Sequence, residues 1–230
     1  MSENIKENLS AIRTRIADTC ARCGRDPNEI TLVAISKTKP LQDILAAHEA
    51  GQNHFGENRA KEIENKMEQA SNPDLIWHFV GTLQTNKIKY MAHRVNWIHS
   101  VWKKKYLKEI ESRAEQHNRV IDTLIQVNIS REDQKSGCEP DELEGILQYA
   151  KNLKHVRVRG LMGMATFTDN PEDVRPEFRL LKDLQTKFIS LNGGAVNLDH
   201  LSMGMSNDME VAIEEGATMI RVGSAIFGER

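Results

Sequence analysis

The feature that most constrains the fold of this chain is a regular alternation of short apolar runs with amphipathic segments. Short apolar runs bounded by polar residues or glycine are typical of strands buried on both faces. Strands that alternate with helices form parallel sheets. We predict eight strands, at residues 30–35, 53–57, 75–80, 95–101, 121–128, 156–164, 197–202 and 218–222.

Eight such strands predict a single (β/α)8 barrel domain that spans residues 1–230. The alternative is an open doubly wound sheet, which the absence of a G-x-G-x-x-G motif after the first strand disfavours. Helices are predicted near residues 40–51, 59–69, 84–91, 103–117, 140–152, 177–191 and 208–215, with a short tail from 223 onward. An extra N-terminal helix is predicted from apolar residues at helical spacing: Ile5, Leu9, Ile12, Ile16 and Cys20.

Composition argues against several classes of function. The formal net charge is -2, from 31 basic and 33 acidic residues, so the chain has no electrostatic footprint for nucleic acid. No segment resembles a signal peptide or reaches the length of a membrane span, so we expect a cytoplasmic protein. Cys20 and Cys23 form a C-x-x-C, but they lack a second ligand pair and fit a helix, so no metal site is predicted.

Polar residues with chemical potential follow several of the predicted strands. Because the carboxyl ends of barrel strands meet on one face, we expect these residues to gather at one mouth. Lys37 follows the first strand, although position alone favours a solvated or salt-bridged turn lysine, since exposed lysine is the default. Asn58 follows the second strand and either caps the next helix or contacts a ligand. His78 and His200 lie near strand ends and are predicted to be hydrogen-bonded core histidines.

The loops after strands seven and eight are predicted to bind a phosphate group. They contain Ser202, Ser206, Gly223 and Ser224, and barrels commonly place a phosphate site in these two loops. Glycine allows backbone N–H groups to approach an anion closely, and the next helix would direct its positive end toward it. Which of Ser202 and Ser206 contacts phosphate stays open, and Ser206 is also a candidate helix N-cap.

Arg221 completes a set of groups that suits one cofactor. An arginine in a barrel strand needs an acceptor, which is either a nearby carboxylate or a ligand atom. A lysine, a phosphate cradle and an arginine together match the needs of a pyridoxal phosphate site. Lys37 would form an imine with the aldehyde, and Arg221 would face the ring nitrogen. The roles of Lys39 and Lys135 stay open.

Five blocks in order along the chain resemble the YggS/PROSC family of pyridoxal phosphate homeostasis proteins. The blocks are VAISKTKP (33–40), FGEN (55–58), WHFVGTLQTNK (77–87), LSMGMS (201–206) and RVGSAIFG (221–228). The resemblance implies a barrel like the N-terminal domain of alanine racemase, with pyridoxal phosphate held covalently on Lys37. It also implies that Arg221 meets the pyridine nitrogen, and that Gly223, Ser224 and the 202–206 loop hold the phosphate.

Family members are regarded as non-enzymatic carriers or regulators of vitamin B6 and amino-acid balance. We therefore expect a monomer without catalytic residues, with apo forms of pyridoxal phosphate enzymes as candidate partners. Racemisation needs two bases, and similar racemases take one from a second domain for which a chain ending at Arg230 leaves no room. An arginine at the ring nitrogen also weakens the cofactor as an electron sink. The alternatives are a racemase-like enzyme using Lys37 and a Schiff-base aldolase on the same barrel.

Overall fold

The computed structural model is a closed barrel of eight parallel strands, in the order β1 to β8. It describes residues 2–130 and 136–228. Each strand pairs with its neighbour in sequence, and β8 closes the barrel by pairing with β1, so that Arg221 lies opposite Val33. The predicted (β/α)8 barrel is confirmed. The strands are β1 Thr31–Ile35, β2 His54–Glu57, β3 Ile76–Phe79, β4 Trp97–Val101, β5 Ile121–Val127, β6 Val156–Gly163, β7 Val196–Ser202 and β8 Met219–Val222.

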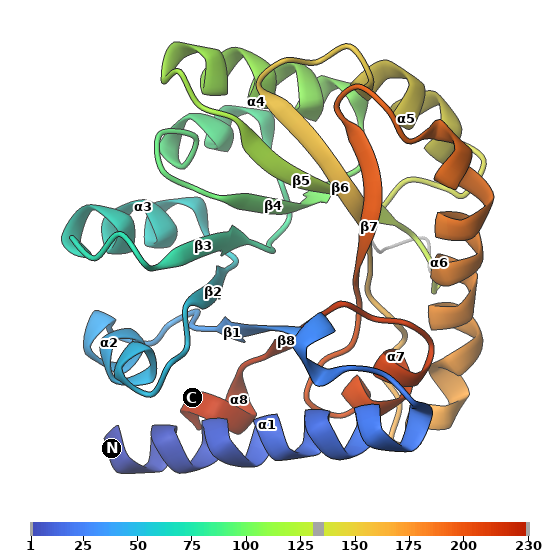
Figure 1. Cartoon of the computed structure of the whole chain (residues 1–230). Coiled ribbons are helices and arrows are strands. Elements are labelled where there is room, and N and C mark those ends of the chain that lie inside the picture. Colours follow the sequence, from blue (N-terminus) through green and yellow to red (C-terminus); the bar gives the residue numbers. More distant parts are fainter. Residues whose placement is uncertain (1, 131–135, 229–230) are drawn as a thin grey trace.

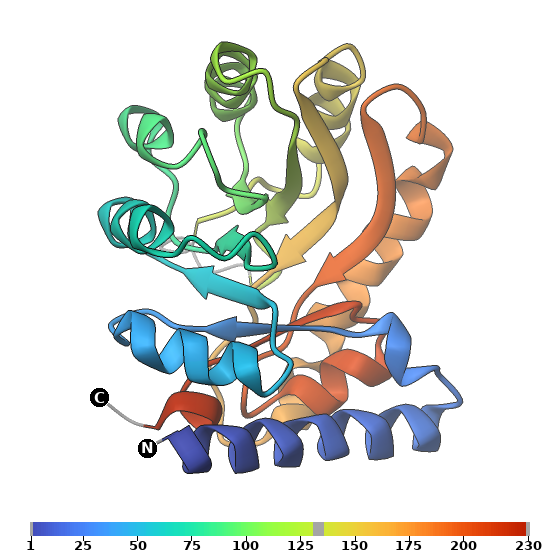
Figure 2. The same ribbon diagram turned by 60° about the vertical axis from the view of Figure 1, so that its left-hand side comes forward.

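Helices cover the outside of the barrel (Figures 1 and 2). Their apolar faces and the outward faces of the strands form one continuous core, whereas a small apolar cluster of Leu124, Met162 and Met219 lies inside the barrel. The α-helices are α1 Ser2–Cys23, α2 Leu41–Glu49, α3 Ala60–Gln69, α4 Lys104–Gln116, α5 Leu143–Ala150, α6 Arg175–Phe188, α7 Met209–Glu214 and α8 Ser224–Phe227. The 3-10 helices are η1 Pro27–Glu29, η2 Thr85–Tyr90, η3 Pro171–Val174 and η4 Ile189–Leu191.

Two predicted segments differ from the structure. The predicted helix at 84–91 is the 3-10 helix η2. Ile88 within it and Met91 at its C-cap are both buried and lie three residues apart, a spacing that matches three residues per turn. The predicted C-terminal tail contains α8, whose four residues are too few to show helical periodicity. The backbone oxygen of Gly223 accepts from the N–H groups of Ile226 and Phe227, which closes this single turn.

The predicted N-terminal helix is confirmed as α1, which crosses the outside of the barrel beside α7 and α8 (Figure 1). Its five predicted apolar positions are all buried. Cys20 and Cys23 both lie in this helix, as their spacing predicted. The Asn8 side chain donates to the backbone oxygen of Ile226 at 2.9 Å. The first and last helices of the chain are therefore held together.

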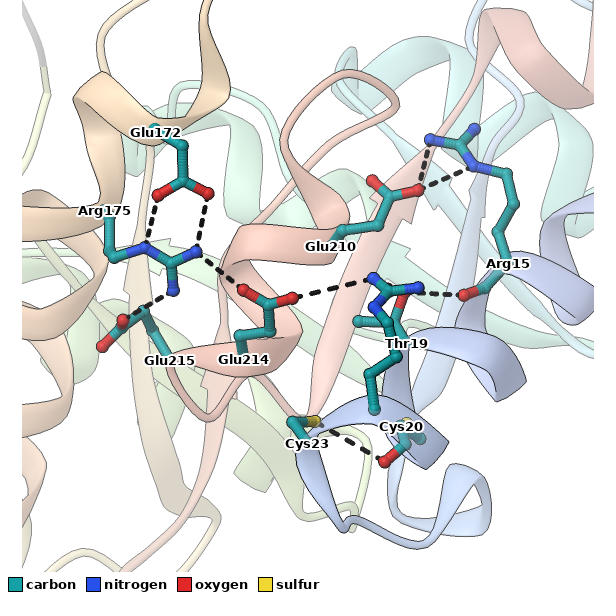
Figure 3. A network of polar contacts seen from close by, with 10 residues as sticks. Arg15, Thr19, Cys20, Cys23, Glu172, Arg175, Glu210, Glu214 and Glu215 are labelled. Atoms are coloured by element: carbon teal, nitrogen blue, oxygen red, sulfur yellow. Dashed lines mark hydrogen bonds and ion pairs between the residues drawn. The ribbon is translucent and has the colours of Figure 1, made fainter.

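A network of ion pairs holds α7 between α1 and α6 (Figure 3). On the α1 side, Arg15 donates to Glu210 at 2.8 Å and to the backbone oxygen of Ser206 at 3.2 Å. On the α6 side, Arg175 donates to three carboxylates at 2.7–2.9 Å, those of Glu172, Glu214 and Glu215. Because α7 follows the loop after β7, this network fixes the far end of the predicted phosphate loop.

We predict that Arg175→Gln lowers the free energy of unfolding by about 1 kcal/mol, since it removes all three pairs from a side chain that is only 24% exposed. The loss should shrink in 1 M salt, which screens charges. Arg179→Gln is the matched control, because Arg179 is 60% exposed and pairs with Glu215 alone, and it should cost under about 0.5 kcal/mol. Urea unfolding measures both, and equal losses would contradict the network's role.

Candidate functional site

Two cavities open side by side at the carboxyl ends of the strands. The larger one, of about 660 Å³, extends over the ends of β2 and β3 toward α3 and η2. The smaller one, of about 310 Å³, lies over the ends of β1 and β8. The residues that line both cavities are Ile35, Lys37, Met205 and Arg221. Lys37 and Arg221 therefore stand at the junction of the two cavities, at the mouth where the sequence predicted them.

Lys37 lies in a strained turn just after β1. Its side chain is half-buried, and within residues 2–130 and 136–228 it has no hydrogen bond or ion pair. The next residue, Thr38, has a φ of 66°, a left-handed conformation that is unfavourable for a β-branched residue. The Thr38 N–H donates to Glu62 at 2.5 Å, which stabilises this turn. By contrast, the Lys39 amine donates to the backbone oxygen of Phe227 at 2.9 Å.

A buried ion pair stabilises the turn that carries Lys37. The Lys66 amine donates to Glu57 at 2.6 Å, to Glu62 at 2.8 Å and to the backbone oxygen of Ser36 at 2.9 Å. The Ser36 hydroxyl also donates to Glu57, at 2.6 Å. Burial raises the pKa of Glu57, and the neighbouring Lys66 opposes that shift. This pair ties the ends of β1 and β2 to α3 and so fixes the backbone that carries Lys37.

Asn58 lines the larger cavity and does not cap α3, because Arg59 occupies the N-cap position. The capping alternative is therefore wrong. The Asn58 Oδ1 atom is buried and has no hydrogen-bond partner in the described part of the chain. Gly81 packs directly against this residue, since a Cβ atom there would lie 2.1 Å from the Asn58 backbone oxygen. Gly81 therefore fixes the backbone position of Asn58, while the orphan oxygen keeps an unused capacity to accept a hydrogen bond.

Arg221 is buried in the barrel and bound to neutral acceptors. Its guanidinium donates to the Ser202 hydroxyl at 2.7 Å and to the backbone oxygen of Gly163 at 3.0 Å. In the described part of the chain neither acceptor is a carboxylate, which was one of the two kinds of partner that the sequence left open. Burial lowers the pKa of Arg221 to about 10, against the opposing charge of Asp208, so the group stays protonated at pH 7. An arginine has five N–H donors, so donors remain for a ligand in the cavity.

The two predicted phosphate loops meet at the smaller cavity, which Ser206, Gly223 and Ser224 all line. A Cβ atom on Gly223 would lie 3.2 Å from the Ile35 backbone oxygen, so the glycine keeps this end of the cavity free. The first N–H groups of α8, beginning at Ser224, lack partners within the helix. Ser206 is not the helix N-cap that the sequence suggested, because Asp208 stands there and its carboxylate accepts from the Met205 N–H at 2.5 Å.

Ser202 lies deeper than its predicted role requires. It is fully buried in the barrel and lines neither cavity at the mouth. Its hydroxyl instead bonds to Arg221 and, at 2.9 Å, to Nδ1 of His99. Strand β7 points this side chain inward below the loop that carries Ser206. Of the two candidate serines, only Ser206 reaches the smaller cavity.

Histidines fill much of the barrel interior. His78 is fully buried and hydrogen-bonded, as predicted, and His200 bonds to the Thr218 hydroxyl at 3.3 Å. His54 and His99, which the sequence did not single out, join His78 and Ser202 in one chain of hydrogen bonds. Alternation along each strand could have placed these histidines on one face, but their hydrogen bonds depend on the register between β2, β3 and β4, which the sequence pattern does not give.

Other expectations are tested only in part. In residues 2–130 and 136–228, no cluster of histidine, cysteine or carboxylate side chains could hold a metal ion, and no helix is long and apolar enough to cross a membrane. Lys135 lies outside the described residues.

Comparison with known proteins decides the family. The family model of the alanine racemase N-terminal domain matches residues 3–230. A protein of Aquifex aeolicus named pyridoxal phosphate homeostasis protein is 45% identical over 227 residues, which cover 99% of each chain. The chain belongs to the pyridoxal phosphate homeostasis protein family.

Solved structures agree with this family membership. The structure of PipY from Synechococcus elongatus, with pyridoxal phosphate bound, is 33% identical and has a TM-score of 0.85. The alignment covers 97% of this chain and all of PipY. An alanine racemase of Clostridium difficile is 13% identical with a TM-score of 0.79, and only 57% of its chain is covered. At that identity the racemase shares the fold alone.

We predict that Lys66→Met lowers the free energy of unfolding by about 3 kcal/mol, because it leaves the Glu57 carboxylate buried without its counter-charge. Adding Glu57→Gln should recover at least about 1 kcal/mol, since no charge then remains buried. Urea unfolding of the two variants and the wild type tests this. If the second substitution deepened the loss, the buried pair would not be the stabilising element described here.

Proposed function

We propose that this protein binds pyridoxal 5'-phosphate at the barrel mouth, through a covalent bond between the Lys37 amine and the aldehyde of the cofactor. The observation that carries the proposal is a half-buried lysine at the junction of two cavities, with no hydrogen bond or ion pair in the described part of the chain. One cavity has a lining of glycine and serine suited to phosphate, and Arg221 stands beside the lysine. The family membership and the bound cofactor of PipY support the same assignment.

The residues present fit the cofactor at each of its polar ends. Ser206, Ser224 and the N–H groups at Gly223 and α8 would hold the phosphate in the smaller cavity. The remaining donors of Arg221 would face the pyridine nitrogen. Asn58 would accept a hydrogen bond through its orphan oxygen. When bound, the cofactor supplies an aldehyde that reacts with amines.

The proposed role is the homeostasis of intracellular pyridoxal phosphate and amino acids, without robust turnover. Relatives that match along nearly their whole length carry the homeostasis name, whereas the racemase shares only the fold. Arg221, protonated and facing the ring nitrogen, would disfavour protonation of that nitrogen and weaken electron withdrawal by the ring. The proposal includes a monomer in the cytoplasm, with apo enzymes that use pyridoxal phosphate as candidate recipients.

The first test locates the covalent bond. After incubation with pyridoxal phosphate and reduction with borohydride, peptide mass spectrometry should find the label on Lys37. Lys37→Ala should lose both the label and the absorption band of the bound cofactor. Lys39→Ala is the matched control and should keep both, because the Lys39 amine is bonded to Phe227. A label on Lys39 in the wild-type protein would overturn the assignment.

The second test concerns the phosphate. Ser224→Ala should weaken binding of pyridoxal phosphate about tenfold, because a hydrogen bond to a charged group contributes about 1.5 kcal/mol or more. Binding of pyridoxal, which lacks the phosphate, should stay unchanged in the same variant. Fluorescence or absorbance titration gives both dissociation constants. Equal losses for the two compounds would place the phosphate away from Ser224.

A further inference from the structure

A line of hydrogen bonds, formed by His54, His78, His99 and Ser202, runs through the barrel from its amino end to Arg221. Nδ1 of His54 lies 2.9 Å from Nε2 of His78, and Nδ1 of His78 lies 2.8 Å from Nε2 of His99. The line continues from Nδ1 of His99 to the Ser202 hydroxyl at 2.9 Å, and from there to Arg221 at 2.7 Å. Its lower end, His54, is the first residue of β2 and lines a separate cleft with Arg13, Asn28 and Gln52.

The register of the barrel produces this line. Gly56 of β2 pairs with His78 of β3, so His54 lies two residues lower than His78. His78 pairs with Trp97 of β4, so His99 lies two residues higher. Side chains two residues apart on a strand share one face, and all three imidazoles therefore point into the barrel. From β2 to β3, and again from β3 to β4, the next histidine of the line therefore lies one inward-facing position closer to the carboxyl ends of the strands.

The buried rings are held rigidly and are uncharged. Trp97 stacks on His78 with an interplanar angle of 8°, and it meets His99 edge to face. His78 and His99 are fully buried, and burial lowers the pKa of each well below its ordinary value. Burial also lowers the pKa of His54. The groups nearest to His99 include the Arg221 cation, which adds to this effect.

Neutral rings give the line a single direction. A neutral imidazole has one N–H donor and one acceptor nitrogen. Each bond between two rings uses one hydrogen, so His54, His78 and His99 must all carry it on the same nitrogen, either Nε2 or Nδ1. The choice at one ring therefore fixes the other two.

Arg221 decides that choice through Ser202. A guanidinium can only donate, so the Ser202 oxygen accepts from it. If His99 also donated to that oxygen, the Ser202 hydrogen would have no acceptor among the hydrogen bonds of the described chain, and Ser202 is fully buried. The satisfied arrangement has Ser202 donating to Nδ1 of His99, and hydrogen on Nε2 of all three rings.

We infer that His99 is a positioning residue for Arg221, held in its acceptor tautomer by the Ser202 hydroxyl and by the matching tautomers of His78 and His54. By accepting the Ser202 hydrogen, His99 turns a lone pair of the serine oxygen toward the guanidinium. The remaining donors of Arg221 are then aimed into the cavity at the mouth. The part of this inference that concerns the cofactor rests on the function proposed above, whereas the tautomers do not.

The tautomers are tested first, on the cofactor-free full-length protein. Nitrogen-15 NMR of the imidazoles at pH 7 should show neutral His78 and His99 with hydrogen on Nε2. Ser202→Ala should release this constraint and change the spectrum of His99. Hydrogen on Nδ1 of either buried ring, or a charged ring, would overturn the inference. This measurement stands even if the protein binds no pyridoxal phosphate.

The positioning role is tested with variants of His99. His99→Gln keeps one acceptor and one donor, so its affinity for pyridoxal phosphate should stay within about twofold of wild type. His99→Phe removes both, and should weaken binding about tenfold and shift the absorption band of the bound cofactor. His200→Phe is the matched control, because His200 lies outside the line, and should change neither.

Two results would overturn the positioning role. One is a loss in His99→Gln as large as that in His99→Phe, which would indicate simple packing. The other is an unchanged band and affinity in His99→Phe. If His99→Phe does not fold, Ser202→Ala replaces it, because it cuts the same link while keeping every ring. An unchanged band and affinity in Ser202→Ala would then count against the inference.

Discussion

The hydrogen bond between Arg221 and Ser202 is the contact on which the barrel interior depends. A cation inside a barrel must find acceptors, and here these are a hydroxyl and a backbone oxygen with no net charge. These two acceptors therefore stabilise the guanidinium without neutralising its positive charge. The charge remains available to a ligand at the mouth. The hydrogen bonds that support Arg221 continue from Ser202 through the buried histidines. An interior usually filled by branched aliphatic side chains is therefore partly polar here, beside the apolar cluster of Leu124, Met162 and Met219.

The mouth is rigid because each of its parts is fixed from outside the barrel. The buried pair of Glu57 and Lys66 holds the turn of Lys37, and α1 and α6 hold α7 behind the loop of Ser206. Neither support touches the cavity. The strain at Thr38 persists because the surrounding contacts over-determine that turn. Surface and buried charges thus position the site without taking part in it.

The sequence predicted the barrel, the N-terminal helix and the gathering of Lys37, Asn58, Arg221 and the phosphate loops at one mouth. It could do so because strand periodicity and strand ends are local signals. It did not predict the histidine line or the buried place of Ser202. These depend on register between strands, which brings His99 to Ser202 across 103 positions of sequence. No local pattern carries that information, and α8 was too short to have a pattern at all.

Closure of the barrel between β1 and β8 determines when the site can form during synthesis of the chain. Lys37 is translated early, but its partners at the mouth, from Arg221 to Ser224, are translated much later, because they belong to the eighth strand of the barrel and the turn after it. During synthesis, Lys37 is therefore present before Arg221, Gly223 and Ser224, which line the smaller cavity with it. Competence to hold a ligand appears only when the final strand pairs with the first. A bound ligand would then stabilise the closed barrel by mass action, so that ligand binding and folding of the barrel would be thermodynamically coupled.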